Sequence, residues 1–437
     1  MAIGSAEYMK RRRQLMRMMG ENAIAIVPGA REKIRNRDTH FPFRQDSDFH
    51  YLTGFPEADA VAVFVPGRKT AEYILFCRDR DPTMETWNGK RAGPEGACEE
   101  YAADDAFPID DIDEILPGLM EGRERVFYTL GSELEFDHRV INWVHRLRAE
   151  VAAYVHTPQE FITLDHYLHD LRLYKSRAEL ACMRKAAKIS IAAHRRVMHA
   201  CRPGKFEYEI EAEITHQFRA SNAHHAYPPI VGSGANSCVL HYVDNSGPLQ
   251  DGDLLLVDTG CEVDYYASDV TRTLPVNGRF SAPQRALYEI VLAAQLAAIE
   301  KAVPGNHWND VHDAARRSIV RGLIELGILK GSLAQLLKKQ AERQFFMHRT
   351  GHWLGLDVHD VGDYKIGDEW RELEPGMVMT VEPGIYIPAR TRGVNRKWWN
   401  MGIRIEDDVL VTKNGPEVLS GGLEKTPADI EALMQVI

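Results

Sequence analysis

The chain has 437 residues, of which 44% are hydrophobic and 27% are charged, and its formal net charge is -10. This length predicts two or three domains, and the composition is ordinary for a globular protein. An acidic balance argues against binding to nucleic acid, whose phosphates need a basic surface. No apolar run approaches the roughly 20 residues that span a bilayer. We therefore expect neither nucleic acid nor a membrane among its partners.

The cysteines and the basic N-terminal stretch bear on location. The six cysteines form no Cys-x-x-Cys pair, which in a chain of this length predicts reduced thiols and a cytoplasmic setting. The stretch 10–20 (KRRRQLMRMMG) is basic and has no apolar core of the secretory kind. We interpret this charge run as the solvated face of a helix.

Residues 1–172 have the pattern of one α/β unit. Short apolar runs bounded by loop residues predict strands at 23–28, 60–65 and 73–77. The loop 78–98 holds Trp87 among polar residues. An exposed tryptophan is typical of a contact surface, and local packing of its ring is an equally good interpretation.

The pattern changes at Ser176, which opens an S-x-x-E capping box and predicts a helix to about Cys201. Apolar residues at four-residue steps predict a second helix over 206–221. Strand-like runs follow at 229–231 and 238–242, and then come two strands joined as a hairpin over 251–274. The first strand of this hairpin ends on Asp258, and the second ends near Asp269.

The same order of elements repeats in the second part of this domain. Helices are predicted from the S-x-x-Q capping box at Ser281 to about 303, from 310 to 326, and over 333–343. Strand-like runs follow at 378–381, 385–387 and 402–411. Helices followed by strands, twice, suggest two related halves whose sheets join.

Five polar residues in or beside these strands are candidates for chemistry: Asp258, Asp269, His352, Glu382 and Glu406. Each residue alone is equally typical of a turn or a strand edge. Four carboxylates converging in a sheet would repel one another, and divalent cations would remove that repulsion. Oxygen ligands with one histidine suit Mn²⁺, Co²⁺, Fe²⁺ or Zn²⁺, and four carboxylates carry enough charge for two ions.

The motifs around these residues resemble those of the bacterial type of the aminopeptidase P (Xaa-Pro aminopeptidase) family. That family belongs to the superfamily of creatinase, prolidase and methionine aminopeptidase. The matching segments follow one another in family order at 230–242, 254–273, 348–360, 380–386 and 402–412. Residues 43–55 also resemble the non-catalytic domain of that family, so the resemblance covers nearly the whole chain.

The resemblance implies a fold with mixed helices and strands, of the α/β or α+β class. It implies a creatinase-like N-terminal α/β domain at 1–172, without catalytic residues. It also implies a C-terminal pita-bread domain at 173–437, in which two αββ-type halves surround a curved, mainly antiparallel sheet.

The resemblance also implies a dinuclear metal site. Asp258 would bind one ion, Asp269 and Glu406 would bridge both, and His352 and Glu382 would complete the shell of the other. Mn²⁺ is the ion that we expect, with Co²⁺ or Zn²⁺ as alternatives.

Three histidines and one glutamate acquire catalytic roles by the same resemblance. Glu382 would take a proton from the nucleophile and pass it to the proline nitrogen. His241 and His359 would hold the substrate or the tetrahedral oxyanion. His348 would line the pocket for proline.

Further residues are implied around the site. Arg404 would orient the carboxylate of Glu406 without binding metal. The expected substrate contacts are Tyr386, Asp38 (for the free amine of the peptide) and Trp87 (in a loop that approaches the active site of a neighbouring subunit).

The activity implied is hydrolysis of the bond between the N-terminal residue of a peptide and a penultimate proline, by a homo-oligomer, either a dimer or a tetramer. Prolidase, which cleaves Xaa-Pro dipeptides with the same metal site, is the alternative. A catalytically inactive pita-bread binding protein is a second alternative. The large N-terminal domain disfavours methionine aminopeptidase.

Overall fold

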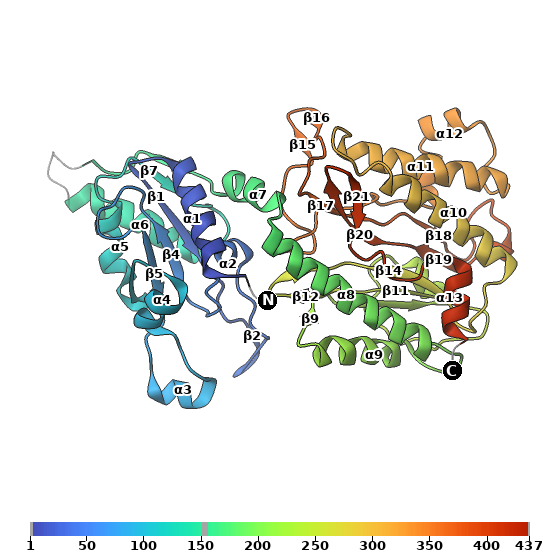
Figure 1. The fold of residues 1–437 in the computed structure, drawn as a ribbon, viewed down its shortest axis with the longest axis horizontal. Coiled ribbons are helices and arrows are strands. Elements are labelled where there is room, and N and C mark those ends of the chain that lie inside the picture. Colours follow the sequence, from blue (N-terminus) through green and yellow to red (C-terminus); the bar gives the residue numbers. More distant parts are fainter. Residues whose placement is uncertain (1–2, 151–155, 436–437) are drawn as a thin grey trace. The chain divides into compact units, whose positions relative to one another are not determined.

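The structure, a computed structural model, describes residues 3–150 and 156–435. It consists of two compact units, one ending at residue 171 and the other beginning at residue 172, which are considered separately (Figure 1). None of the described helices is both long enough and apolar enough to cross a membrane.

The N-terminal unit is built on a six-stranded mixed sheet with the order β6-β5-β4-β1-β7-β8. The three predicted strands are present, and β1 pairs antiparallel with β4 and parallel with β7. Its apolar core lies between the sheet and the helices α5 and α6, and includes Ile24, Phe76 and Trp143. The strands are β1 (Ala23–Pro28), β4 (Val61–Phe64), β5 (Tyr73–Cys77), β6 (Asp105–Pro108), β7 (Arg125–Phe127) and β8 (Glu160–Ile162). The other elements are α1 (Ser5–Met19), α2 (Ser47–Thr53), α3 (Pro82–Asn88), α4 (Gly93–Tyr101), α5 (Ile112–Met120), α6 (Leu134–Glu150), α7 (Asp165–Leu173) and the hairpin β2 (Ile34–Asn36) and β3 (Thr39–His40).

The basic stretch in α1 is not the solvated face that the sequence predicted. Arg11 and Arg12 are each only 3% exposed. Their guanidinium groups donate to the carbonyl oxygens of Tyr51 and Leu52, both at 3.0 Å. These carbonyls lie at the C-terminal end of α2, where helical partners are missing. The interpretation was therefore wrong for these two arginines, because they satisfy the end of a neighbouring helix.

The first half of the C-terminal unit places two helices on short antiparallel strands. The capping box of Ser176 and Glu179 forms as predicted and begins α8 (Arg177–Ala200), and α9 (Glu207–Ala220) packs beside it. β11 pairs with both β10 and β14, and its register sets Asp258 opposite Thr271. The strands are β9 (His224–His225), β10 (Ile230–Ser233), β11 (Leu254–Asp258), β12 (Cys261–Val263), β13 (Tyr266–Ala267) and β14 (Thr271–Pro275).

The second half repeats the order of helices followed by strands, as predicted. Its α10 packs against β17, β18 and β19, and one apolar core runs through both halves. The helices are α10 (Ala282–Ile299), α11 (Trp308–Glu325), α12 (Leu333–Lys338) and the C-terminal α13 (Pro427–Met434). The strands are β15 (Lys365–Ile366), β16 (Glu369–Trp370), β17 (Val378–Val381), β18 (Gly384–Ile387), β19 (Met401–Arg404), β20 (Asp407–Thr412) and β21 (Gly415–Val418).

The predicted hairpin over 251–274 consists of four strands, not two. β11 pairs with β14, while β12 pairs with β13 in a separate small sheet. Asp264 and Tyr265 have positive φ values of 50° and 69° and make the turn between β12 and β13. The second predicted strand is therefore interrupted, and Asp269 lies in the link that precedes β14.

Three other predicted elements differ in detail. The run 238–242 is not a strand, because a 3₁₀ helix over Gly234–Cys238 ends there and Val239 donates back to the carbonyl of Asn236. The helix predicted over 333–343 stops at Lys338, since Gln340 takes a left-handed conformation. The run 402–411 is two strands, with a break at 405–406.

Candidate metal centre

Strand ends from both halves of the C-terminal unit contribute to one cluster. Asp258 is the last residue of β11, and Asp269 lies just before β14. Glu382 directly follows β17, and Glu406 lies in the break between β19 and β20. The backbone of His352 is held beside β17 by two hydrogen bonds with Thr380, of 2.9 and 3.1 Å. Both halves therefore supply candidate ligands.

The side chains of this cluster approach one another closely. One ligand atom from each of Asp269, His352 and Glu406 lies within 4.8 Å of the other two. The Nε2 atom of His352 is 3.4 Å from Oδ2 of Asp269 and 3.7 Å from Oε1 of Glu382. The structure thus brings four of the five predicted ligands together directly.

Asp258 joins this group through Tyr227, which the sequence analysis missed. The Tyr227 hydroxyl contacts Oδ1 of Asp258 at 2.6 Å and also contacts Oδ1 of Asp269. A hydroxyl carries one proton, so it donates to only one of the two carboxylates at a time. Tyr227 precedes Pro228 and Pro229, and this segment has no pattern that indicates a contact with carboxylates far along the chain.

The pKa values of the cluster show an excess of negative charge. Burial raises the pKa of Glu382 to about 7. Burial, with the charges of Asp269 and Glu382, raises the pKa of Glu406 well above its ordinary range. Burial also raises the pKa of Asp258, against the opposing effect of Arg404.

His352 and Asp269 stabilise each other's charged forms. Burial alone would lower the pKa of His352, but the hydrogen bond with Asp269 and the nearby Glu382 charge raise it to about 9. Burial is the largest single influence on Asp269 and would raise its pKa, but the hydrogen bond and charge of His352, with Tyr227 and Arg404, together outweigh burial and lower that pKa. Of the other three carboxylates, Asp258 is paired with Arg404, whereas burial keeps the pKa values of Glu382 and Glu406 raised.

The donor set fits divalent metal ions. Arg404 donates to Asp258 at 2.6 Å, and the other basic group of the cluster is His352. Against them stand four carboxylates at a site where charge is poorly solvated. Carboxylate oxygens with one imidazole nitrogen are typical ligands of hard and borderline divalent cations. These residues therefore fit a centre for divalent metal.

Arg404 contacts Glu406 only indirectly. Its Nε donates to Oγ1 of Thr271 at 3.2 Å, and that hydroxyl donates to Oε2 of Glu406 at 2.6 Å. Its Nη1 and Nη2 donate to the Tyr386 hydroxyl and to Asp258, at 2.8 and 2.6 Å. The guanidinium thus orients Asp258 directly, whereas the sequence analysis gave it Glu406 as its partner.

The three predicted histidines surround the cluster. The Nε2 atom of His348 is 2.9 Å from the Tyr386 hydroxyl, and its Nδ1 is 3.8 Å from Glu382. Burial, with Arg404 adding to it, lowers the pKa of His348 to about 3, so its ring is neutral. The rings of His359 and His352 lie 4.3 Å apart, and His359 and His241 are exposed. The ring N–H groups of such exposed imidazoles can donate hydrogen bonds to a bound peptide.

The remaining predicted residues, Asp38 and Trp87, lie in the N-terminal unit. Both side chains are exposed, and that of Trp87, in α3, is 79% exposed. The cluster described above is built from the C-terminal unit alone.

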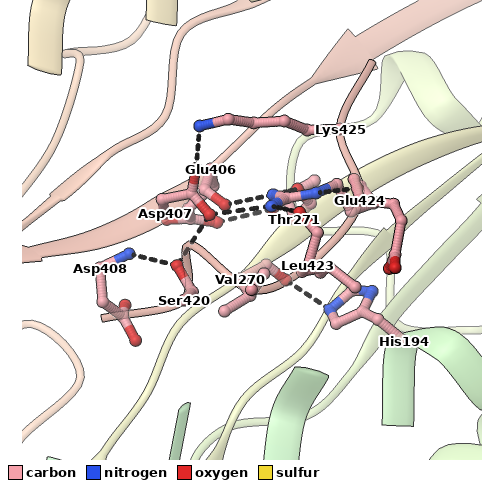
Figure 2. Close-up of polar contacts among 12 residues, drawn as sticks. His194, Val270, Thr271, Glu406, Asp407, Asp408, Ser420, Leu423, Glu424 and Lys425 are labelled. Carbon is pink, nitrogen blue, oxygen red and sulfur yellow. Dashed lines mark hydrogen bonds and ion pairs between the residues drawn. The ribbon is translucent and has the colours of Figure 1, made fainter. Parts of the chain in front are cut away.

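Two further residues hold the cluster from behind, and the sequence analysis did not find them. Oδ1 of the buried Asp408 accepts a hydrogen bond from the backbone N–H of Asp269 at 3.0 Å. The buried ring of His194, in α8, is 3.0 Å from the carbonyl oxygen of Val270 (Figure 2). Asp408 stood in a motif that the sequence analysis examined, whereas His194 lies in a helix with no such motif.

Known proteins match this chain in sequence and in structure. The profile of Metallopeptidase family M24 matches residues 181–413, and that of Aminopeptidase P, N-terminal domain, matches residues 8–128. The chain is 43% identical over 434 residues to an Xaa-Pro aminopeptidase of Escherichia coli, covering 99% of this chain and 98% of that protein. It is also 43% identical to an Xaa-Pro aminopeptidase of Haemophilus influenzae, over 98% of this chain and 97% of the other.

Solved structures agree with these matches. An aminopeptidase of Pseudomonas aeruginosa superposes with a TM-score of 0.98 at 55% identity, covering 99% of this chain and 98% of that one. Zinc-substituted aminopeptidase P of E. coli in complex with product superposes with a TM-score of 0.96 at 42% identity, covering 99% of both chains.

Proposed function

The chain belongs to metallopeptidase family M24, and from this premise we propose that it hydrolyses the bond between the N-terminal residue of a peptide and a penultimate proline. The membership confirms the predicted fold, an N-terminal α/β domain followed by a pita-bread domain. One observation carries the proposal. The ligand atoms of Asp269, His352 and Glu406 lie within 4.8 Å of one another, close enough to bind the same metal ion.

We propose that the centre holds two divalent ions, with Mn²⁺ as the native metal and Co²⁺ or Zn²⁺ as substitutes. Asp258 would bind one ion, Asp269 and Glu406 would bridge both, and His352 and Glu382 would complete the shell of the other. The number of carboxylates supports two ions rather than one, because a single divalent cation leaves a net negative charge at the site. When bound, two such ions would activate water and polarise the scissile carbonyl.

We propose that Glu382 moves the proton. Its side chain is 18% exposed and lies between His352 and His348, at 3.7 and 3.8 Å. A carboxylate at the open side of the cluster can accept a proton from water and deliver it to the proline nitrogen. The exposed imidazoles of His241 and His359 would hold the peptide carbonyl during this transfer.

The proline ring requires a pocket of its own. An amide before proline has no N–H, and its ring restricts the preceding residue, so general peptidases bind it poorly. The neutral ring of His348 lies against Phe346 and Tyr386, with ring centroids 5.0 and 5.5 Å apart. This partly apolar wall suits a pyrrolidine ring.

Several assignments extend this proposal. We place the non-catalytic domain at 1–172 and the catalytic domain at 173–437, and we propose a homo-oligomer in the cytoplasm, a setting that the six free cysteines suit. The substrate roles of Asp38 and Trp87 stay predictions from the resemblance.

The test is cleavage of matched peptides. We expect release of the first residue from Xaa-Pro-Yaa and not from Xaa-Ala-Yaa, with slower turnover of the dipeptide Xaa-Pro. Glu382→Gln should lower kcat by about 10²–10⁴-fold, whereas Glu374→Gln, at an exposed position that accepts from Tyr174, should leave it unchanged. Equal cleavage of Xaa-Ala-Yaa would contradict the proposed specificity, and turnover of Xaa-Pro alone would identify a prolidase.

A further inference from the structure

A second buried polar cluster lies directly behind the metal centre. Its centre is Arg272, which is 0% exposed and belongs to the largest fully buried side chains of the described residues. Arg272 follows Thr271, and its main partner Asp407 follows Glu406. Each member of this ion pair is thus adjacent in sequence to a residue of the metal centre.

All five N–H groups of Arg272 have an acceptor. Nη1 donates to the carbonyl oxygens of Thr271 and Glu406, at 2.9 and 2.6 Å. Nη2 donates to Oδ1 of Asp407 at 2.8 Å and to the carbonyl of Leu423 at 3.4 Å, and Nε donates to the carbonyl of Glu424 at 2.9 Å. A guanidinium has five donors in one plane, so this one joins three chain segments and keeps no donor free.

Asp407 is fixed by further partners. Its Oδ2 accepts from Nζ of Lys425 at 2.8 Å, and its Oδ1 accepts from Ser420 at 2.7 Å (Figure 2). Oδ2 also accepts from Gln295 at 2.7 Å. Lys425 and Ser420 belong to the segment between β21 and α13. The Arg272–Asp407 pair therefore anchors this segment to the back of the metal centre.

The sheet ladders do not set the distance between Asp269 and Glu406. Asp269 precedes β14, which pairs with β11, whereas Glu406 lies between β19, which pairs with β18, and β20, which pairs with β17. The direct links across this gap include the bond from the N–H of Glu406 to the carbonyl of Thr271, at 3.1 Å. The two carbonyl oxygens that share Nη1 of Arg272 belong to these same residues.

We propose that Arg272 is a positioning residue for the divalent-metal centre: it clamps the carbonyls of Thr271 and Glu406 together and so fixes the separation of the ligands Asp269 and Glu406. This inference rests on the proposed function, because it takes those residues as ligands. Arg272 contacts neither ligand side chain, and it acts through the backbone of each half of the domain.

A matched pair of variants tests the inference. Arg272→Lys keeps a positive charge for Asp407 but has three donors on a single nitrogen, so it does not span both carbonyls. Arg195→Met is the control. Arg195 binds Glu424 and Gly422 in the same segment between β21 and α13, and within the described part of the chain its hydrogen bonds do not involve the residues around Asp269 or Glu406. The readouts are Mn²⁺ affinity by calorimetry, the magnetic coupling of two bound Mn²⁺ ions by electron paramagnetic resonance, and unfolding of the metal-free proteins.

We expect Arg272→Lys to bind the second Mn²⁺ about 10–100-fold more weakly and to lose the coupled signal at metal concentrations that saturate the wild type. Its kcat should fall while KM stays unchanged, since Arg272 is remote from the substrate side. Arg195→Met should match the wild type in affinity and coupling. A purely structural role for Arg272 would lower the unfolding midpoint and leave both metal readouts intact, which overturns the inference.

If Arg272→Lys does not fold, a milder variant tests the positioning role of Arg272. Ser420→Ala removes one donor from Asp407 and the acceptor of the Asp408 N–H, and it should weaken the second Mn²⁺ site measurably. Unchanged affinity overturns the inference. Absence of Mn²⁺ binding by the wild-type protein would overturn the proposed function together with this inference. Wild-type binding by Arg272→Lys overturns the inference alone.

Discussion

Two adjacent acidic residues, Glu406 and Asp407, have opposite surroundings. Both are buried. Glu406 accepts a hydrogen bond from Thr271 and faces the charges of Asp269 and Glu382, and its pKa is raised, with burial as the first cause. Asp407 is equally buried, but Arg272 and Lys425 outweigh the effect of burial and lower its pKa (Figure 2). Burial alone therefore does not identify a functional carboxylate.

Asp360 is of the same kind as Asp407. It is buried beside Lys175 at 2.9 Å and Arg172 at 2.6 Å, and these cations outweigh burial and lower its pKa. Asp407 and Asp360 each have buried cations of the chain as direct partners, whereas the side chain of Glu406 has the Thr271 hydroxyl as its hydrogen-bond donor, and a bound metal ion would compensate its charge. The predictions below test this distinction.

The largest effect is expected for Glu406→Gln. The amide keeps the shape of the side chain but removes the charge that we propose bridges the two ions. Metal content should therefore fall, and Xaa-Pro-Yaa turnover should drop by about 10³-fold or more, comparable to the loss of a principal catalytic group. Elemental analysis and peptide kinetics measure both. Full turnover with two ions still bound would contradict the assignment of Glu406 as a ligand.

Stability should change in opposite directions for the two neighbours. In the metal-free protein, Glu406→Gln relieves repulsion and should raise the urea midpoint. Asp407→Asn leaves the buried charges of Arg272 and Lys425 without their partner and should lower the free energy of unfolding by about 5 kcal/mol. Urea unfolding after treatment with a chelator measures both changes. If both variants change the stability of the metal-free protein in the same direction, the proposed difference between Glu406 and Asp407 is contradicted.

A smaller and pH-dependent loss is expected for Asp360→Asn. Arg172 keeps Asp357 at 2.7 Å as a partner, so the loss should be about 3 kcal/mol at pH 7. Because the folded pKa of Asp360 lies below its ordinary value, its stabilisation is complete above that ordinary value and is lost as pH falls through the folded pKa. The gap between wild type and variant should therefore narrow below about pH 4. A gap that is constant or widens at low pH would show that the charge of Asp360 is not the stabilising feature.

Ser176→Ala gives the scale of an ordinary contact. It removes the capping box at the start of α8 and should lower the free energy of unfolding by about 1 kcal/mol, with metal binding unchanged. If Ser176→Ala lowers the free energy of unfolding as much as Asp360→Asn does, the buried ion pairs contribute no more to stability than a helix cap.

The sequence predicted the features that are local or carried by a motif. The capping boxes begin helices where expected, the repeat of helices and strands is present, and the five ligand candidates lie in four of the matching motifs. The break at Glu406 was not predicted, because residues 402–411 form a run with nothing in the sequence that marks an interruption. It arises from contacts with Thr271, 135 residues away.

No sequence pattern indicated the residues whose contacts are with partners far along the chain. Tyr227 and Arg272 meet partners up to 42 and 152 residues away. The partners of Tyr227 lie in the same half of the domain, whereas those of Arg272 include residues of the other half. No local period in the sequence records either kind of contact. The prediction that Arg11 and Arg12 are solvated was wrong for the same reason, because the carbonyl oxygens that accept their hydrogen bonds belong to residues 40 positions further along the chain.

The most direct test is titration of metal-stripped wild-type protein with Mn²⁺, Co²⁺ and Zn²⁺ while Xaa-Pro-Yaa hydrolysis is followed. We expect no hydrolysis without metal and recovery that saturates at two ions per chain, with cleavage only before proline. Hydrolysis by protein shown to contain no metal, or saturation at one ion, would contradict the dinuclear centre.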